Sequence, residues 1–224
     1  MSYTLNSMPI QIDEVLLEKA QQVETATIGH RRQLGFMDSS IQPVLPGRRI
    51  AGTAVTLALP GQDSTLLHHI IQFLRPKDIL VIDRLGDHKH ACLGGGVAVA
   101  IKAQGCFGVV IDGACTDVPE IEEYDLPVWC RGPSPITTRL YNIGGSFNVD
   151  IACGGAVVHP GDIVVCDNSG VLTMPPDEAE SDIVWALGKQ SAEPASHQAI
   201  LEGDKLGHRS GATAMVEEKL KQKS

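Results

Sequence analysis

Apolar and polar residues alternate along the middle of the chain in blocks that predict strands and helices in turn. Short apolar runs at 54–59, 79–83 and 107–112 predict buried strands, and the second and third runs end in an aspartate. Between these runs, apolar residues recur at helical spacing over 66–74, and a second helix is predicted over 97–104. Strands that alternate with helices indicate parallel pairing, because a parallel crossover needs a connection of this length.

The two ends of the chain and the segment 146–174 follow other patterns. Acidic residues at 13 and 14, then apolar residues at helical spacing, predict a helical N-terminal segment over 1–35. Residues 146–174 contain short apolar runs separated by glycine- and proline-containing turns, which predicts an antiparallel, barrel-like portion. The C-terminal helical segment, 177–224, is predicted to open with a helix ending near Gln190. Since no repeat or linker divides the sequence, we expect a single α/β domain over 1–224.

Composition and charge exclude several classes of protein. Of 224 residues, 43% are hydrophobic and 20% charged, which is typical of a globular protein. The 27 acidic and 18 basic residues give a net charge of −9, which disfavours a nucleic-acid partner. No apolar run reaches the length of a membrane span and no secretory signal is recognisable, so we expect a cytoplasmic protein without a membrane partner. The six cysteines include no C-x-x-C pair and are expected to be reduced and mostly buried.

Two neighbouring segments carry candidate chemistry. The run Gly94-Gly95-Gly96 precedes the helix predicted over 97–104, and free N–H groups at a helix start bind anions. A tight strand-to-helix turn explains the same glycines equally well. Further along, Thr116 and Asp117 follow a predicted strand, and one carboxylate beside a hydroxyl suffices for Mg²⁺, which keeps several waters. The residues alone favour a different role for Asp117, as the cap of a helix over 118–123.

Other polar groups give weaker signals. Asp87-His88-Lys89-His90 has the residue types of a metal site, but a solvated loop fits its spacing better. His68 and His69 are expected on a helix surface. Arg131, between a predicted strand and a proline-containing turn, either binds a substrate carboxylate or holds its own loop in place. No G-x-S-x-G motif is present, so nucleophilic catalysis has little support.

Six blocks follow one another along the chain: Arg49–Thr56, Asp78–Asp83, Leu93–Gly96, Gly108–Val118, Pro127–Pro135 and His159–Val171. In order and spacing these blocks resemble the RraA-like family, which includes metal-dependent 4-hydroxy-4-methyl-2-oxoglutarate aldolases and oxaloacetate decarboxylases. The resemblance extends from about residue 35 to 205. It implies a single-domain α/β/β/α sandwich with a central barrel-like mixed sheet. It also implies homotrimers or hexamers in which neighbouring subunits share the active site.

The resemblance assigns roles to individual residues. The aldolase branch carries Gly-Asp, then twenty residues, then Arg-Asp; here Gly94-Gly95 and Thr116-Asp117 occupy these positions. Asp117 would hold Mg²⁺ or Mn²⁺, and the N–H groups of Gly94, Gly95, Gly96 and Val97 would bind the substrate's carboxylate. Thr116 offers one neutral hydrogen bond where the aldolases have an arginine, and Arg131 is a further candidate for substrate binding. Glu193 is the candidate carboxylate that a neighbouring subunit would contribute.

The predicted function is a divalent-metal-dependent lyase that cleaves a carbon–carbon bond in small 2-oxo acids through a pyruvate enolate. Thr116 and Asp117 would be the catalytic residues. The alternative is a non-catalytic RraA-like protein that regulates a ribonuclease by binding it. That branch departs from the Arg-Asp pair at the aspartate, which this chain retains as Asp117. A methyltransferase, a label once given to family members, is disfavoured because the chain has no glycine-rich cofactor signature.

Overall fold

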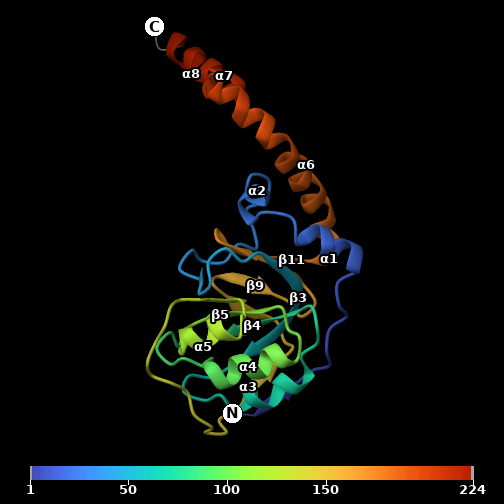
Figure 1. Ribbon diagram of the computed structural model, residues 1–224, viewed down its shortest axis with the longest axis vertical. Helices are drawn as coiled ribbons and strands as arrows, with labels where there is room; N and C mark the ends of the chain where they lie inside the picture. Colours follow the sequence, from blue (N-terminus) through green and yellow to red (C-terminus); the bar gives the residue numbers. More distant parts are fainter. Residues whose placement is uncertain (1, 223–224) are drawn as a thin grey trace.

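Strand β3 (Ile50–Ala58) lies at the centre of a large mixed sheet in the computed structural model, which describes residues 2–222 (Figure 1). One edge of β3 pairs in parallel with β4 (Asp78–Asp83). The other edge is shared, because its first residues pair with β10 (Ile163–Asp167) and its last residues pair with β7 (Gly145–Phe147). The sheet therefore branches at β3.

The remaining strands extend the sheet on both sides of β3. Its order is β1-β7-β3-β4-β5-β6-β2, with β10 and β11 on the branch. The strands from β3 to β6 are parallel, as the alternating pattern predicts, whereas β2, β10 and β11 pair antiparallel. A separate antiparallel hairpin is formed by β8 and β9. The bounds are β1 Tyr3–Leu5, β2 Gln42–Pro43, β5 Gly108–Asp112, β6 Val128–Cys130, β8 Ile151–Cys153, β9 Ala156–Val158 and β11 Gly170–Met174.

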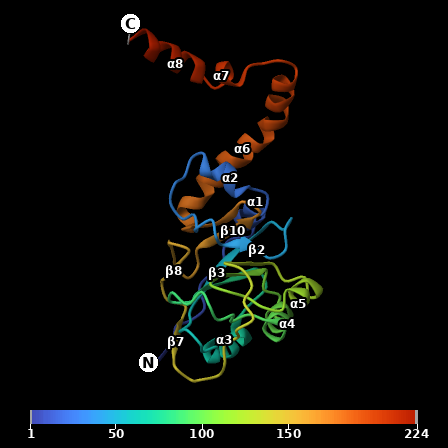
Figure 2. The same cartoon turned by 90° about the vertical axis from the view of Figure 1, so that its left-hand side faces the viewer.

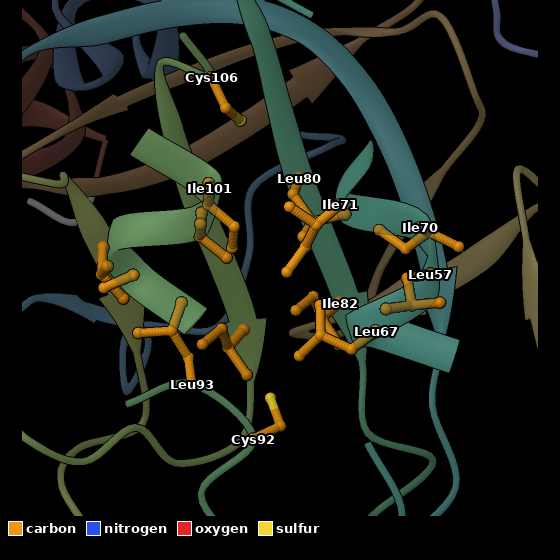
Figure 3. Packing of buried hydrophobic residues seen from close by; sticks show 14 of the residues in the cluster. Leu57, Leu67, Ile70, Ile71, Leu80, Ile82, Cys92, Leu93, Ile101 and Cys106 are labelled. Atoms are coloured by element: carbon orange, nitrogen blue, oxygen red, sulfur yellow. The ribbon is translucent and has the colours of Figure 1, made fainter. Parts of the chain in front are cut away.

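Helices cover one face of the parallel strands. These are α3 (Thr65–Ile70) with the 3₁₀ turn η1 (Ile71–Phe73), α4 (Gly95–Ala103) and α5 (Val118–Glu123). Successive side chains of β4 point to opposite faces, so Leu80 and Ile82 pack against these helices (Figure 3), while their neighbours pack on the β8–β11 side. Burial on both faces explains why β4 is an uninterrupted apolar run.

A second helical layer covers β10 and β11. It consists of α1 (Glu14–Ala20), α2 (Thr25–Gly29) and the first turns of α6 (Pro176–Leu201), which share one buried cluster with both strands. The layers thus run from helices to the parallel strands, to the β8–β11 strands, and to helices again. The mixed α/β class with a large mixed sheet is confirmed.

The end of the chain extends away from this body as an arm. The buried residues of α6 all lie between 179 and 186, and no residue from 192 to 222 is buried. Helices α7 (Leu206–Arg209) and α8 (Ala212–Lys221) continue beyond α6 (Figures 1 and 2). We call residues 192–222 the C-terminal arm. Among the described residues, no helix combines the length and hydropathy that crossing a membrane requires.

Two predictions about the chain ends need correction. The segment 1–35 is only partly helical, because residues 3–5 form β1 against the edge of β7 before the short helices α1 and α2. The C-terminal helix does not end near Gln190 but continues to Leu201. It does so although Pro194 removes one backbone donor, because the residues that follow favour helix.

Candidate functional site

A cleft of about 520 Å³ opens where the start of α4 faces α3 and the loop after β5. Its polar end is formed by Gly94–Val97 together with Thr116 and Asp117. Its walls include His68 on α3 and apolar side chains of α4. The structure therefore brings together the glycine run and the Thr-Asp pair, which lie far apart in sequence.

The start of α4 is capped by a side chain from another segment. Gly94 holds the N-cap position with extended backbone (φ −134°) and has no side chain of its own to cap the helix. The N–H of Gly95 instead donates to Oδ2 of Asp117, at 3.0 Å. Because the first helical hydrogen bond runs from Ala98 N to Gly94 O, the N–H groups of Gly96 and Val97 have no helical acceptor. These two N–H groups, at the positive end of the helix dipole, suit a carboxylate.

Asp117 is oriented by its backbone conformation. Thr116 N donates to Leu93 O at 2.8 Å, and Asp117 then adopts a left-handed φ of 53°, which aspartate tolerates better than most residues. Its carboxylate consequently reaches Gly95 and makes no capping bond to α5, so the expected capping role is wrong. Oδ1 accepts a hydrogen bond from Thr116 Oγ1 at 3.2 Å. In the described structure no basic side chain forms an ion pair with this exposed carboxylate.

The three glycines differ in what requires them. A Cβ atom on Gly94 would lie 2.5 Å from Asp117 Oδ2, so only glycine leaves room for the carboxylate. A Cβ atom on Gly95 would lie 3.0 Å from Cβ of Glu120, whereas one on Gly96 would meet no atom within 4 Å. Close packing therefore explains why Gly94 and Gly95 are glycines. No atom near Gly96 requires a glycine at that position.

Glu120 is a candidate that the sequence reasoning missed. Its side chain, on the first turn of α5, is exposed and lies over Gly95, the position where the aldolase pattern has an aspartate. A carboxylate three residues after Asp117 lies about one helical turn away, so this spacing was the available signal.

The groups at the polar end of the cleft fit a hard cation. Asp117 and the Thr116 hydroxyl line the cleft, and Glu120 lies beside Gly95 just outside the lining. These groups offer oxygen atoms only, which suits Mg²⁺ or Mn²⁺ better than zinc. No group of three or more His, Cys, Asp or Glu residues in the described chain is arranged to hold a metal. Asp117 and Glu120 are two carboxylates, which is the number that Mg²⁺ commonly takes while it keeps several of its waters.

Arg131 is not part of this cleft. Its Nε donates to Oδ1 of Asp112 at 2.5 Å, and its Nη1 donates to the Ser40 hydroxyl, so the guanidinium holds its own loop. It lines a different cavity. Of the two roles considered for Arg131, these contacts support the one in which it holds its own loop.

The remaining candidates also lie outside the cleft, except for one histidine. His90 Nδ1 lies 2.7 Å from Asp87 Oδ2 within a turn, so this segment forms a loop. His68 and His69 are exposed on α3, as expected, and His68 lines the cleft. Glu193 is half-buried on α6 and does not line the cleft of its own chain. Its contribution to a neighbouring subunit stays a prediction.

Comparison with known proteins shows one family match over most of the chain. Residues 19–173 match the RraA-like family model, described as Aldolase/RraA. The chain belongs to the RraA-like family. Over 164 residues it is 32% identical to a Halalkalibacterium halodurans protein whose name assigns it provisionally as a 4-hydroxy-4-methyl-2-oxoglutarate aldolase, covering 73% of this chain and 78% of that protein.

A solved RraA structure shares the fold. The Streptomyces coelicolor protein RraAS2, described as an unusual member of the RNase ES inhibitor RraA family, superposes with a TM-score of 0.75 at 26% identity. The match covers 84% of this chain and 99% of that one. The family resemblance is thus confirmed, and RraA-like relatives carry both an enzymatic and a regulatory description.

Proposed function

We propose that this RraA-like chain is a divalent-metal-dependent lyase that cleaves a carbon–carbon bond in small 2-oxo acids, of the 4-hydroxy-4-methyl-2-oxoglutarate aldolase or oxaloacetate decarboxylase type. The observation that carries the proposal is the carboxylate of Asp117. It is exposed in the cleft, it has no ion-pair partner among the described residues, and the N–H of Gly95 fixes its direction. An aspartate placed in this way is available to a cation.

Binding a dianionic substrate needs positive potential that the lining side chains do not supply. No lysine or arginine is found among the described residues that line the cleft, and the chain carries a net charge of −9. The free N–H groups of Gly96 and Val97 would take one substrate carboxylate at the start of α4. Asp117 and Glu120 would hold Mg²⁺ or Mn²⁺ beside it.

The chemistry of the cleft depends on where negative charge develops. A bound divalent cation would act as a Lewis acid toward the substrate's 2-oxo group. Retro-aldol cleavage and decarboxylation both leave a pyruvate enolate, so one site serves both reactions. The hydroxyl of Thr116 would donate one hydrogen bond to the developing negative oxygen, without the positive charge that arginine brings to the aldolase branch.

The proposed assembly is a homotrimer or a hexamer. The C-terminal arm supports it, because an arm with no buried residue of its own exposes Leu201, Leu206 and Met215 to solvent in an isolated chain. In the assembly, Glu193 at the base of the arm would reach the cleft of a neighbouring subunit.

The proposal is tested by measuring pyruvate release from oxaloacetate and from 4-hydroxy-4-methyl-2-oxoglutarate, with Mg²⁺ and with EDTA. We expect turnover that EDTA abolishes and that Asp117→Asn lowers by about 100-fold or more, since the residue would be a metal ligand. Glu120→Gln should lower turnover as well. Glu123→Gln removes the same charge from an exposed position on α5 outside the cleft and should have no effect.

Two results would contradict the proposal. Absence of turnover on both substrates at saturating Mg²⁺ would refute the lyase function and favour the ribonuclease-binding alternative. Full activity in Asp117→Asn would refute the role of Asp117 as a metal ligand, because the carboxylate would then have no part in the reaction.

A further inference from the structure

Two cysteines outside the cleft form a close pair. The sulfur atoms of Cys115, in the loop after β5, and Cys130, the last residue of β6, lie 3.5 Å apart. Both residues line a second cavity of about 350 Å³, which Arg131 and Ser40 also line. All six cysteines are free and buried, and among the described residues no other hydrogen bond joins two cysteine sulfur atoms. The pair is therefore a dithiol facing a cavity.

The geometry of the pair favours a bond between its sulfur atoms. A disulfide has an S–S length of about 2.05 Å, so the two atoms need to approach by roughly 1.5 Å. The N–H of Gly132 lies 3.3 Å from Sγ of Cys130 and donates to it, which stabilises a thiolate there. The hydrogen bond with Cys115 lowers the pKa of the Cys130 thiol, burial raises it, and the bond from Gly132 lowers it again. Together these effects bring the pKa of Cys130 to about 7.

We propose that Cys115 and Cys130 are a modification site, oxidised by a small peroxide to a reversible disulfide that displaces the Thr116–Asp117 segment. The Cys130 thiolate attacks one peroxide oxygen, the O–O bond breaks, and the sulfenic acid of Cys130 and one water form after protonation. The Cys115 sulfur then attacks the Cys130 sulfur, and the sulfenic oxygen leaves as a second water with the Cys115 proton. Two thiols are oxidised and one hydrogen peroxide is reduced to two waters.

Burial of the two thiols decides which oxidant reaches them. Their relative exposures are 0% and 1%, so access is through the cavity alone. Hydrogen peroxide needs only a small local opening of the cavity wall to reach the buried sulfur atoms, whereas glutathione disulfide is bulky and would have to align its own sulfur atoms with a buried thiol. The site is thus selective for a peroxide.

The pair is linked to the cleft by backbone contacts. Cys115 forms β-bridges with Leu93, which precedes Gly94, and with Pro133, and Thr116 N donates to Leu93 O. Movement of Cys115 toward Cys130 therefore pulls on both segments that form the polar end of the cleft. The effect on metal binding rests on the proposed function, whereas formation of the disulfide does not.

The experiment treats the reduced full-length protein with hydrogen peroxide and maps its disulfides by mass spectrometry. We expect a loss of about 2 Da, a peptide linking Cys115 to Cys130, and reversal by dithiothreitol. Cys130→Ser should prevent the link, while Cys106→Ser, a control at a buried thiol that donates to Asp78 O, should retain it. Glutathione disulfide should not produce the link.

The consequence for the cleft is measured separately, as hydrogen exchange of residues 113–120 and as Mg²⁺ affinity before and after oxidation. We expect faster exchange in the oxidised protein and Mg²⁺ binding weakened by about tenfold or more. Oxidation to sulfinic acid without the Cys115–Cys130 link, or a link with unchanged exchange, would overturn the inference. If the reduced protein does not bind Mg²⁺ at all, the proposed function fails, and the disulfide and its effect on exchange are judged on their own.

Discussion

Replacement of Gly94 by alanine tests how the start of α4 positions Asp117. The added Cβ atom would lie 2.5 Å from Asp117 Oδ2 and 2.9 Å from Cγ2 of Thr116. The backbone of Gly94 is extended, so alanine introduces no conformational strain, and the whole effect falls on the two side chains. The carboxylate must leave the N–H of Gly95. Gly96→Ala is the matched control, because its Cβ atom would meet nothing within 4 Å.

The size of the effect follows from the hydrogen bond that is lost. A hydrogen bond to a charged group contributes about 1.5–3 kcal/mol, but Asp117 is exposed and water replaces the donor, so we expect a loss of about 1 kcal/mol. In a chain of this length that lowers the melting temperature by about 2–4 °C. Gly96→Ala should instead raise it slightly, because alanine favours helix by up to about 1 kcal/mol. Mg²⁺ affinity should fall by about 10- to 100-fold in Gly94→Ala, through misplacement of the ligand.

Two measurements test whether Gly94 positions Asp117 for metal binding. Thermal unfolding reports the stability of both variants, and titration calorimetry with MgCl₂ reports their affinities. If Gly94→Ala bound Mg²⁺ as tightly as Gly96→Ala, the contact between Gly94 and Asp117 would have no bearing on metal binding.

Four further predictions concern the core, the pH dependence, the arm and the reaction. Ile101→Ala, at a fully buried position of α4, should cost about 2–5 kcal/mol in denaturant unfolding, and a loss below about 1 kcal/mol would contradict the packing. Burial raises the pKa of Asp63, but hydrogen bonds from Thr65, Ile143 and Tyr141 outweigh it and lower that pKa to about 2. The stability that Asp63 contributes is therefore complete above the ordinary pKa of 3.8 and is lost as the pH falls toward 2. Asp63→Asn should remove this pH dependence of the unfolding free energy, and an unchanged acid unfolding curve would contradict the prediction. Deletion of 192–224 should leave circular dichroism of the body intact but reduce the sedimenting mass to that of a monomer, and an intact trimer would exclude the arm from assembly. Thr116→Arg should raise kcat on oxaloacetate more than it changes KM, because arginine brings positive charge to the developing oxyanion. A lower kcat would show that Thr116 does not take the place of the aldolase arginine.

The local sequence pattern was sufficient to identify strands that are buried on both faces. The run 79–83 is buried on both faces as β4, so its apolar character alone identifies it. Strand β1 has no such signal, because three exposed residues, Tyr3–Leu5, become a strand only by pairing with β7. The continuation of α6 past Pro194 was missed because a proline normally ends a helix.

The candidate site shows the same limit at the scale of one side chain. Asp117 directly before a helix is the residue type of an N-cap, and local pattern therefore predicts that it caps α5. Its left-handed backbone turns the carboxylate to the N–H of Gly95 on another helix, a contact that depends on how the two segments pack. The sequence left two roles open for Arg131 for a related reason, since its partners Asp112 and Ser40 come from other parts of the chain.

The branched pairing of β3 has a consequence for how the nascent chain folds. Strand β3 gains its two partners on the shared edge only when residues 145–147 and 163–167 have been synthesised. Tyr3 pairs with Gly145, far later in the sequence, so β1 emerges from the ribosome long before its partner strand. Pairings of such long range slow folding, because the entropy of closing a large loop is lost before any contact repays it. Until those residues emerge, the central apolar strand β3 lacks its partners on one edge, so we expect chaperones to bind this segment during synthesis.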